Sequence, residues 1–131
     1  MVALGKEAGF SGHPVAPPDC LLAGGETTVT LRGQGKGGRN QELALAAAIA
    51  LEGFSRISLL SAGTDGTDGP TEAAGAFVDG ATCQRARARG LDPGDFLSRH
   101  DSFHFFESLG DLLITGPTRT NVMDIMCLLI E

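Results

Sequence analysis

Three glycine-rich loops divide this chain, and each of them follows a short run of apolar or β-branched residues. The loops span residues 33–40, 63–70 and 116–121. An apolar run that stops at glycine is typical of a buried strand that ends in a turn. Helical segments alternate with these runs, so the sequence predicts an α/β layered domain. Its sheet is expected to be mixed and partly parallel, with helices flanking it.

The predicted elements follow from periodicity and from helix start and stop residues. Asn40 is the expected N-cap of an all-round apolar helix that ends before Gly53, and Asp92 and Asp101 are the expected N-caps of two later helices. The expected strands are residues 20–23, 27–31, 57–62, 75–79, 112–114 and 122–130, and the expected helices are residues 41–52, 81–89, a short one from 93, and 102–109.

The chain is 131 residues long, which fits one ordinary domain. Residues 9–18 are rich in glycine and proline, so we interpret residues 1–18 as an interdomain linker or the edge of an expressed fragment, and residues 19–131 as the domain. A net charge of −6 leaves no basic footprint for nucleic acid. The longest apolar run is too short to span a membrane, so neither nucleic acid nor a membrane is an expected partner.

The three cysteines are widely spaced, and no pair has metal-ligand spacing. Cys20 and Cys127 lie in apolar runs and are expected to be buried small hydrophobic residues, and this cysteine usage favours a reducing compartment.

The first loop contains the pattern G-x-G-x-x-G at Gly33, Gly35 and Gly38, between a predicted strand and a predicted helix. A dinucleotide site also needs an acidic residue about twenty positions further on, at the end of the next strand, and that residue is missing here. The loop is not a Walker A motif either, because Lys36 is followed by Gly37.

The same loop predicts an anion site at the start of the helix. Glycine lets backbone N–H groups approach an oxyanion, and the helix N-terminus adds partial positive charge. Lys36 and Arg39 add two full charges, and Arg39 can hold a phosphate or carboxylate with two hydrogen bonds. The alternative is a tight strand–helix turn with both basic side chains in solvent.

The second loop places Asp65 and Asp68 three residues apart among small residues, which suits Mg²⁺ held partly through water and phosphate oxygens. The alternative is a pair of Asx-turns.

The third loop holds hydroxyl and amide donors and Arg119, and its alternative is an ordinary polar loop. Glu26 lies between two predicted strands, where it can face the same crevice or solvent. The chain's three histidines are interpreted as surface residues.

The stretches 21–46 (LLAGGETTVTLRGQGKGGRNQELALA), 61–80 (SAGTDGTDGPTEAAGAFVDG) and 112–122 (LLITGPTRTNV) together resemble one family. They are similar, in the same order, to the C-terminal MOFRL domain of the glycerate 2-kinases. The resemblance covers nearly everything except the N-terminal residues. In and directly after the third stretch, the family often has Gly where this chain has Arg119, and Asn where it has Met123.

The resemblance implies a cytoplasmic (or mitochondrial) kinase that uses ATP and Mg²⁺ to convert D-glycerate to 2-phosphoglycerate. The family enzyme has a larger N-terminal domain that is absent here, and its active site lies between the domains, so this chain is expected to carry half a site and to be inactive alone. On this basis the candidate residues are Arg39 and Lys36 for catalysis, Asp65 and Asp68 for the metal, and Glu26, Gly35, Gly37, Gly38, Asn40, Thr118 and Asn121 for substrate or nucleotide.

Two rival functions stay open. The first is an NAD(P)-dependent hydroxypyruvate reductase, because of the glycine pattern and because family members have carried that name. The second is a non-catalytic interaction domain, which could form a homo-oligomer through an exposed cleft face.

Overall fold

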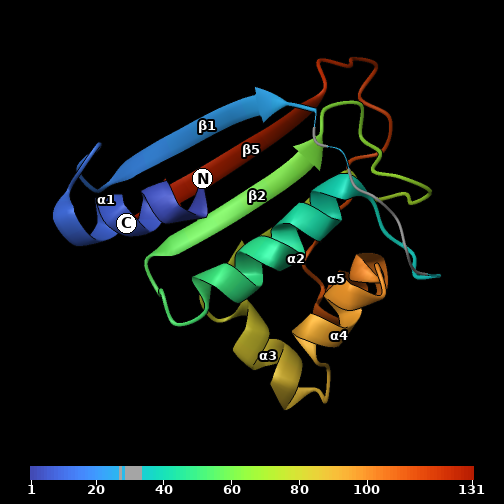
Figure 1. Cartoon of the computed structure of the whole chain (residues 1–131). Helices are drawn as coiled ribbons and strands as arrows, with labels where there is room; N and C mark the ends of the chain where they lie inside the picture. The colour runs from blue at the N-terminus through green and yellow to red at the C-terminus, as the bar shows by residue number, and fades with distance from the viewer. Residues whose placement is uncertain (27, 29–33) are drawn as a thin grey trace.

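The strand at the centre of the sheet is β2, and it comes from the middle of the chain rather than from either end (Figure 1). The computed structural model describes residues 1–26, 28 and 34–131. The strand order is β1-β5-β2-β3-β4. The strands are β1 (Asp19–Gly25), β2 (Ile57–Gly63), β3 (Gly75–Asp79), β4 (Leu112–Leu113) and β5 (Asp124–Ile130). The helices are α1 (Val2–Ser11), α2 (Arg39–Leu51), α3 (Thr82–Ala88), α4 (Pro93–Ser98) and α5 (Ser102–Leu109).

Each neighbouring pair in this sheet is antiparallel, so the expectation of a partly parallel sheet is wrong for the strands that the structure describes. The error has a simple cause. β1 and β2 do run in the same direction, and α2 connects them, as expected for a strand–helix–strand unit. However, the C-terminal strand β5 lies between the two and pairs antiparallel with both.

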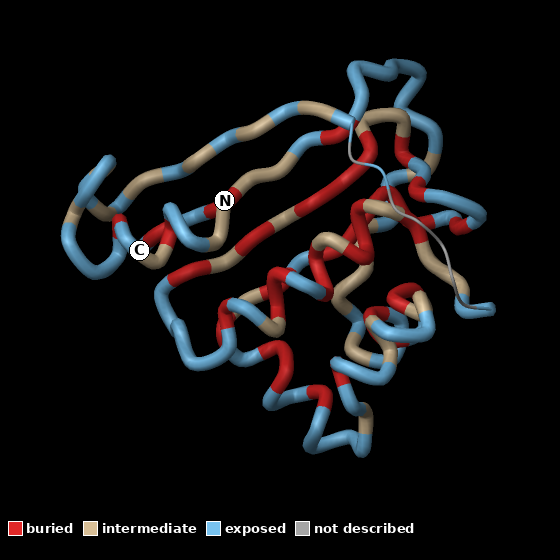
Figure 2. Tube along the Cα trace, viewed as in Figure 1, coloured by how far each residue is buried: buried red, intermediate tan, exposed pale blue. Residues whose placement is uncertain are grey.

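Alternation along the strands separates a helix-covered face from an open face. On β5, Leu128 and Ile130 are buried in the core with Leu45 and Phe105, whereas Leu129 is 47% exposed. Figure 2 shows the buried positions concentrated along β2 and α2. The alternate positions point away from the core and leave apolar side chains at the surface, namely Leu22, Phe77, Ile125 and Leu129.

Most predicted elements are present with small shifts of their ends. Asp92 caps α4 as expected, because its carboxylate accepts a hydrogen bond from the backbone N–H of Gly94. The predicted strand 27–31 falls almost entirely outside the described residues. The stretch interpreted as a linker contains a helix, α1, whose Gly5 and Ala8 are buried. Within the described ranges, no helix has the length and apolar character needed to cross a bilayer.

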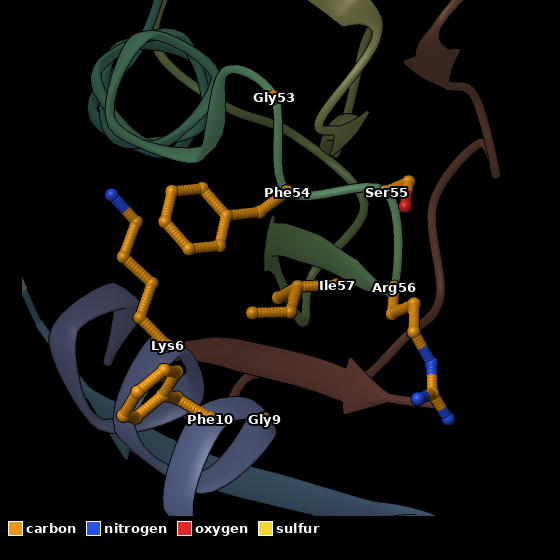
Figure 3. A pocket seen from close by; sticks show the side chains of 8 residues that line it. All are labelled: Lys6, Gly9, Phe10, Gly53, Phe54, Ser55, Arg56 and Ile57. Carbon is orange, nitrogen blue, oxygen red and sulfur yellow. The ribbon is translucent and has the colours of Figure 1, made fainter.

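A hollow of about 270 Å³ lies between α1 and the turn that follows α2 (Figure 3). The Nζ atom of Lys6 is 4.1 Å from the centre of the Phe54 ring, so the two side chains face each other across it. The hollow also borders Ile57, the first residue of β2, whereas the glycine loops adjoin the other end of that strand. It is therefore separate from the predicted site.

Two non-glycine residues, one in the third loop and one just after it, have left-handed backbone conformations. Arg119 has φ 63° and Met123 has φ 69°. This region is costly for most side chains and is tolerated best by Gly and Asn. The resemblance implies Gly and Asn at these two positions, and a positive φ is a physical reason to expect them there.

Replacing Met123 by Asn should therefore stabilise the fold by about 0.5–1 kcal/mol, because Met123 is 51% exposed and loses little packing. Urea unfolding monitored by circular dichroism measures the change. Val122→Asn is the matched control, since Val122 is also exposed but does not have a positive φ. Equal effects of the two substitutions would contradict a backbone origin.

Candidate functional site

The three glycine loops meet at one end of the sheet, where β1 and β2 end and where β5 and α2 begin (Figure 1). The carboxylates of this region differ in how far they are exposed to solvent. Asp68 and Asp124 are each only 3% exposed, whereas the Glu26 side chain is 56% exposed. The contacts of these three acids define the site.

Asp68 caps the first turn of α2 from the second loop. Its Oδ1 accepts the backbone N–H of Asn40 at 3.0 Å, and its Oδ2 accepts that of Gln41 at 2.9 Å. The Gln41 side chain also donates to Oδ2, at 3.0 Å. The end of α2 that was predicted to bind an external anion thus already binds a carboxylate of the protein, which satisfies two otherwise unpaired N–H groups.

Asn40 is not the N-cap that the sequence suggested, because α2 begins at Arg39, two residues earlier than predicted, and Gly38 is the N-cap. Asn40 lies in the first turn, where it is 1% exposed. Its side-chain amide donates to Asp124 Oδ1 at 3.0 Å, and its side-chain oxygen accepts from the Ser61 hydroxyl at 2.7 Å. It therefore ties α2 to the end of β2 and the start of β5.

Arg39 is held by two acids of very different exposure. Its Nε and Nη2 donate to the two oxygens of the buried Asp124, at 2.6 and 3.0 Å. Its Nη1 lies 3.3 Å from Oε1 of the exposed Glu26. The hydrogen bonds that Arg39 donates to Asp124 contribute most to a raised pKa for Arg39, which keeps the guanidinium charged. With a side chain 37% exposed, Arg39 still presents part of its donor set to solvent.

Sequence reasoning missed Asp124 and predicted Glu26 only as a lining residue. The available signal was an acid at the start of an otherwise apolar final strand, where a buried charge needs a partner. Asp124 faces Gly25 and Gly63 in the two neighbouring strands, so the carboxylate lies where the ends of β1 and β2 flank it. A hollow of about 210 Å³ opens beside it, bordered by Leu22, Thr64 and Val122 among others.

The glycines of the first loop are explained by close packing inside the domain. A Cβ atom on Gly35 would overlap the backbone carbonyl of His100, one on Gly37 would overlap the Ser102 hydroxyl, and one on Gly38 would overlap Asp68. Lys36 is likewise engaged, since its Nζ lies 3.8 Å from the centre of the Phe103 ring and 3.6 Å from Glu72. These contacts favour the structural alternative for the glycines and leave the Lys36 prediction untested. Gly33 lies outside the described residues.

Asp101 anchors the first loop to the start of α5. It is the N-cap residue of α5, as the sequence predicted, but its side chain makes no capping hydrogen bond to that helix. Instead its Oδ1 accepts the backbone N–H of Lys36 at 3.0 Å and contacts Nδ1 of His104 at 2.6 Å. Burial acts to raise the pKa of Asp101, but these two contacts and the charge of Arg99 outweigh it, so the pKa lies below its ordinary value.

The second and third loops are joined to each other by threonines. The Thr64 hydroxyl donates to the Met123 carbonyl at 2.7 Å, and the Thr118 hydroxyl donates to the Thr64 carbonyl at 2.5 Å. Asn121 forms a local turn by accepting the backbone N–H of Met123. Thr118 and Asn121 were predicted to bind a ligand. Their side chains have hydrogen-bond partners within this region of the domain.

Asp65 and Asp68 each have hydrogen-bond partners of their own within the domain. Asp65 Oδ1 accepts the backbone N–H of Thr67 at 3.0 Å, which is the Asx-turn left open as the alternative. Both Asp68 oxygens serve α2. In the described part of the chain, no group of three or more His, Cys, Asp or Glu residues could hold a metal ion. The donor set seen here does not fit a protein-bound Mg²⁺, and metal binding by these residues stays a prediction.

A second interaction that the sequence did not reveal links His100 to Glu42. Nδ1 of His100 lies 2.8 Å from Glu42 Oε1, with side chains 16% and 10% exposed. His100 has φ 57° and belongs to the segment against which Gly35 packs. It is therefore half-buried and paired, not an ordinary surface histidine.

The Asp68 contacts predict a clear contrast between the two acids of the second loop. Asp68→Asn should destabilise the fold by about 2–3 kcal/mol, because an amide cannot accept from all the N–H groups that face it. Asp65→Asn should cost less than about 1 kcal/mol, because Asn also forms Asx-turns. Urea unfolding of both variants, in EDTA and in excess Mg²⁺, makes the comparison. Equal losses, or losses only with Mg²⁺ present, would support the metal pair instead.

The lowered pKa of Asp101 predicts a pH dependence of stability. A carboxylate whose folded pKa is depressed stabilises the fold above its unfolded pKa, near 4, and loses this contribution as the pH falls through the folded value. Asp101→Asn should therefore cost about 1 kcal/mol at pH 7, with partial solvent screening included. The difference from wild type should shrink below pH 4, as measured by urea unfolding from pH 2 to 7. A constant difference would show that the charge of Asp101 is not what matters.

Comparisons with known proteins agree on one family. The family model described as MOFRL matches residues 19–124. D-glycerate 2-kinase of Thermotoga maritima is 55% identical over 121 residues, which is 92% of this chain and 29% of that protein. Human glycerate kinase is 54% identical over 114 residues, covering 82% of this chain and 22% of that protein. A protein of Agrobacterium vitis named putative hydroxypyruvate reductase is 47% identical, over 99% of this chain and 30% of its own.

Solved structures show the same fold. A crystal structure of glycerate kinase from Thermotoga maritima superposes with a TM-score of 0.97 at 53% identity, over 99% of this chain and 31% of that chain. A Pyrococcus horikoshii protein superposes with a TM-score of 0.92 at 43% identity, over 98% of this chain and 30% of that chain. This chain thus spans less than a third of the length of these relatives. It belongs to the MOFRL family.

Proposed function

We propose that this domain forms one side of the active site of an ATP-dependent D-glycerate 2-kinase, within a longer polypeptide like those of its relatives. The observation that carries the proposal is Arg39, a partly exposed arginine fixed at the start of a helix by a buried carboxylate. Phosphoryl transfer asks a protein mainly for positioned positive charge around the transferred group. Arg39 offers such a charge, with its orientation already fixed.

The two acids on Arg39 have different parts in this proposal. Asp124 is buried and binds two guanidinium nitrogens, so it orients the side chain and stays in place. Glu26 is exposed and contacts the remaining nitrogen at 3.3 Å. An anionic group of the substrate can take over that outer contact, while Glu26 turns into solvent at little cost. Arg39 would then hold a carboxylate or a phosphoryl oxygen.

The phosphoryl donor and its metal belong to the same proposal. ATP would supply the phosphoryl group, and Mg²⁺ would neutralise charge on its phosphates. The contacts of Asp65 and Asp68 do not fit a metal pair in this domain. We therefore assign the metal ligands, the general base and the other side of the cleft to the rest of the longer enzyme. We also propose that this enzyme is cytoplasmic. Lys36 remains a proposed secondary charge.

The remaining candidates are proposed as supports of the site more than as ligands. Gly35, Gly37 and Gly38 let the first loop lie against α5 and the second loop, and Asn40 connects Asp68 with Asp124. Thr118 and Asn121 shape the third loop. Each of these residues affects catalysis through the position of Arg39 or of the loops around it.

The reductase alternative is favoured by the names of two Agrobacterium vitis relatives, both called putative hydroxypyruvate reductase. The geometry argues against it. In a dinucleotide fold the pyrophosphate lies at the N-terminus of the helix that follows the glycine loop. Here Asp68 binds the N–H groups of that turn, and its negative charge would repel a pyrophosphate. A kinase that binds its substrate through Arg39 does not need a phosphate group at the N-terminus of α2.

The test is a coupled glycerate kinase assay on the longer enzyme with Arg39 variants. Arg39→Lys keeps the charge but loses the planar donor set, so kcat/KM should fall at least about tenfold. Arg39→Ala should fall further, on the order of a thousandfold, with a loss in kcat as well as in kcat/KM. Urea unfolding of the same variants separates catalysis from folding.

The matched control is Arg56→Ala. Arg56 is an exposed arginine directly before the first residue of β2, at the end of the strand away from the site. This substitution should leave the kinetic constants unchanged. The 131-residue chain alone should show no turnover. Unchanged kcat/KM in Arg39→Ala would remove Arg39 from the site, and NADH-dependent reduction of hydroxypyruvate without kinase activity would favour the reductase.

A further inference from the structure

Two of the three cysteines lie in contact on neighbouring strands. Cys20 is on β1 and Cys127 is on β5, and the register pairs Cys20 with Leu129 and Leu22 with Cys127. The two cysteines are therefore diagonal neighbours on one face of an antiparallel pair, where side chains can meet. Their Sγ atoms are 3.4 Å apart. The sequence placed these residues 107 positions apart and gave no sign of the contact.

The pair lies on the open face of the sheet, not in the core. Cys20 is exposed and Cys127 is half-buried, which corrects the expectation that both are buried hydrophobic residues. On β5, Cys127 lies between Met126 and Leu128, which point to the opposite face of the sheet, where Leu128 is fully buried. Cys83 is different, since it is fully buried in the core beside α2. The chain thus contains a reachable pair of thiols and an unreachable single one.

The geometry allows a covalent bond after a small movement. A disulfide has an S–S length of about 2.05 Å, so the two sulfur atoms must approach by roughly 1.4 Å. In the described part of the sheet, β1 is an edge strand that pairs only with β5. It can shift along its partner without disturbing a second neighbour. Diagonal neighbours usually have Cα atoms about 7–8 Å apart, which is beyond the ordinary range for a disulfide, so the backbone of β1 must move and the bond formed is easily reduced.

We infer that Cys20 and Cys127 are a reversible thiol–disulfide modification site that reacts with a low-molecular-weight disulfide such as oxidised glutathione. The Cys20 thiolate attacks one sulfur of glutathione disulfide, which forms a mixed disulfide and releases one glutathione thiolate. The Cys127 thiolate then attacks Sγ of Cys20, which forms the internal disulfide and releases the second glutathione. Two protein thiols are oxidised, one glutathione disulfide is reduced, and the two thiol protons pass to the released glutathione thiolates.

The order of attack follows from access. Cys20 is exposed, so an external disulfide reaches it first. Burial raises the pKa of the Cys127 thiol and its contact with Cys20 raises it further, which makes Cys127 the poorer first nucleophile. Once Cys20 carries glutathione, Cys127 is already beside the sulfur that it must attack. The product joins β1, which leads to Glu26, to β5, which begins at Asp124.

The experiment uses the reduced 131-residue chain and oxidised glutathione as the probe. Intact mass spectrometry should show a final loss of about 2 Da, the two thiol hydrogens, after a transient adduct of one glutathione. Thiol titration in denaturant should fall from three to one. Peptide mapping should link the Cys20 and Cys127 peptides, and dithiothreitol should restore the starting mass.

Three variants make the outcome decisive, with circular dichroism confirming that each one is folded. Cys127→Ser should stop at the mixed disulfide on Cys20, Cys20→Ser should lose the fast reaction, and Cys83→Ala should behave as wild type. The inference is overturned if wild type also stops at the mixed disulfide, if it keeps three thiols after prolonged treatment, or if Cys20 joins two chains instead of forming the internal bond. The inference does not depend on the kinase proposal, because no step uses Arg39 or a kinase substrate.

Discussion

Asp68 occupies the position on which the other contacts of the site depend. Its carboxylate lies against the first turn of α2 and accepts the backbone N–H groups of Asn40 and Gln41. A helix start buried without partners would leave several N–H groups unsatisfied, so the second loop must reach across to α2 for that helix to be buried. Once Asp68 is in place, Asn40 points toward Asp124, and Arg39 follows at the same turn.

The same requirement explains why glycine recurs in the first loop. For Asp68 to reach the turn, the backbone at Gly38 must lie against that carboxylate, where a Cβ atom has no room. On the other side, Gly35 lies against the segment that carries His100, and Asp101 accepts the N–H of Lys36. For Gly35 and Gly38, the two described glycines of the pattern, contacts within the domain therefore explain the absence of a side chain, and a carboxylate of the protein binds the first turn of α2.

The parts of the fold that sequence predicted correctly are those set by local signals. Periodicity located α2 and most strands, and the Asp92 cap located the start of α4. The insertion of β5 between β1 and β2 is a long-range pairing without a local signal, and it turned the expected mixed sheet into an antiparallel one. The candidate site shows the same division. Local signals pointed to Arg39 and Asp68 as candidates, whose functional roles stay predictions. Asp124, the buried partner of Arg39, lies at the start of β5, whose pairing has no local signal.

A buried acid and an exposed acid on one arginine suggest how a half-site can be both stable and ready to bind. An arginine with only buried partners would be fixed but unavailable, and one with only exposed partners would be available but poorly oriented. Asp124 supplies orientation through two hydrogen bonds in a desolvated place, where such bonds are strongest. Glu26 supplies a weak, solvent-screened contact that an incoming anion can replace. This division gives Arg39 directed positive charge before any ligand is present, which is the preorganisation that the proposed phosphoryl transfer would require.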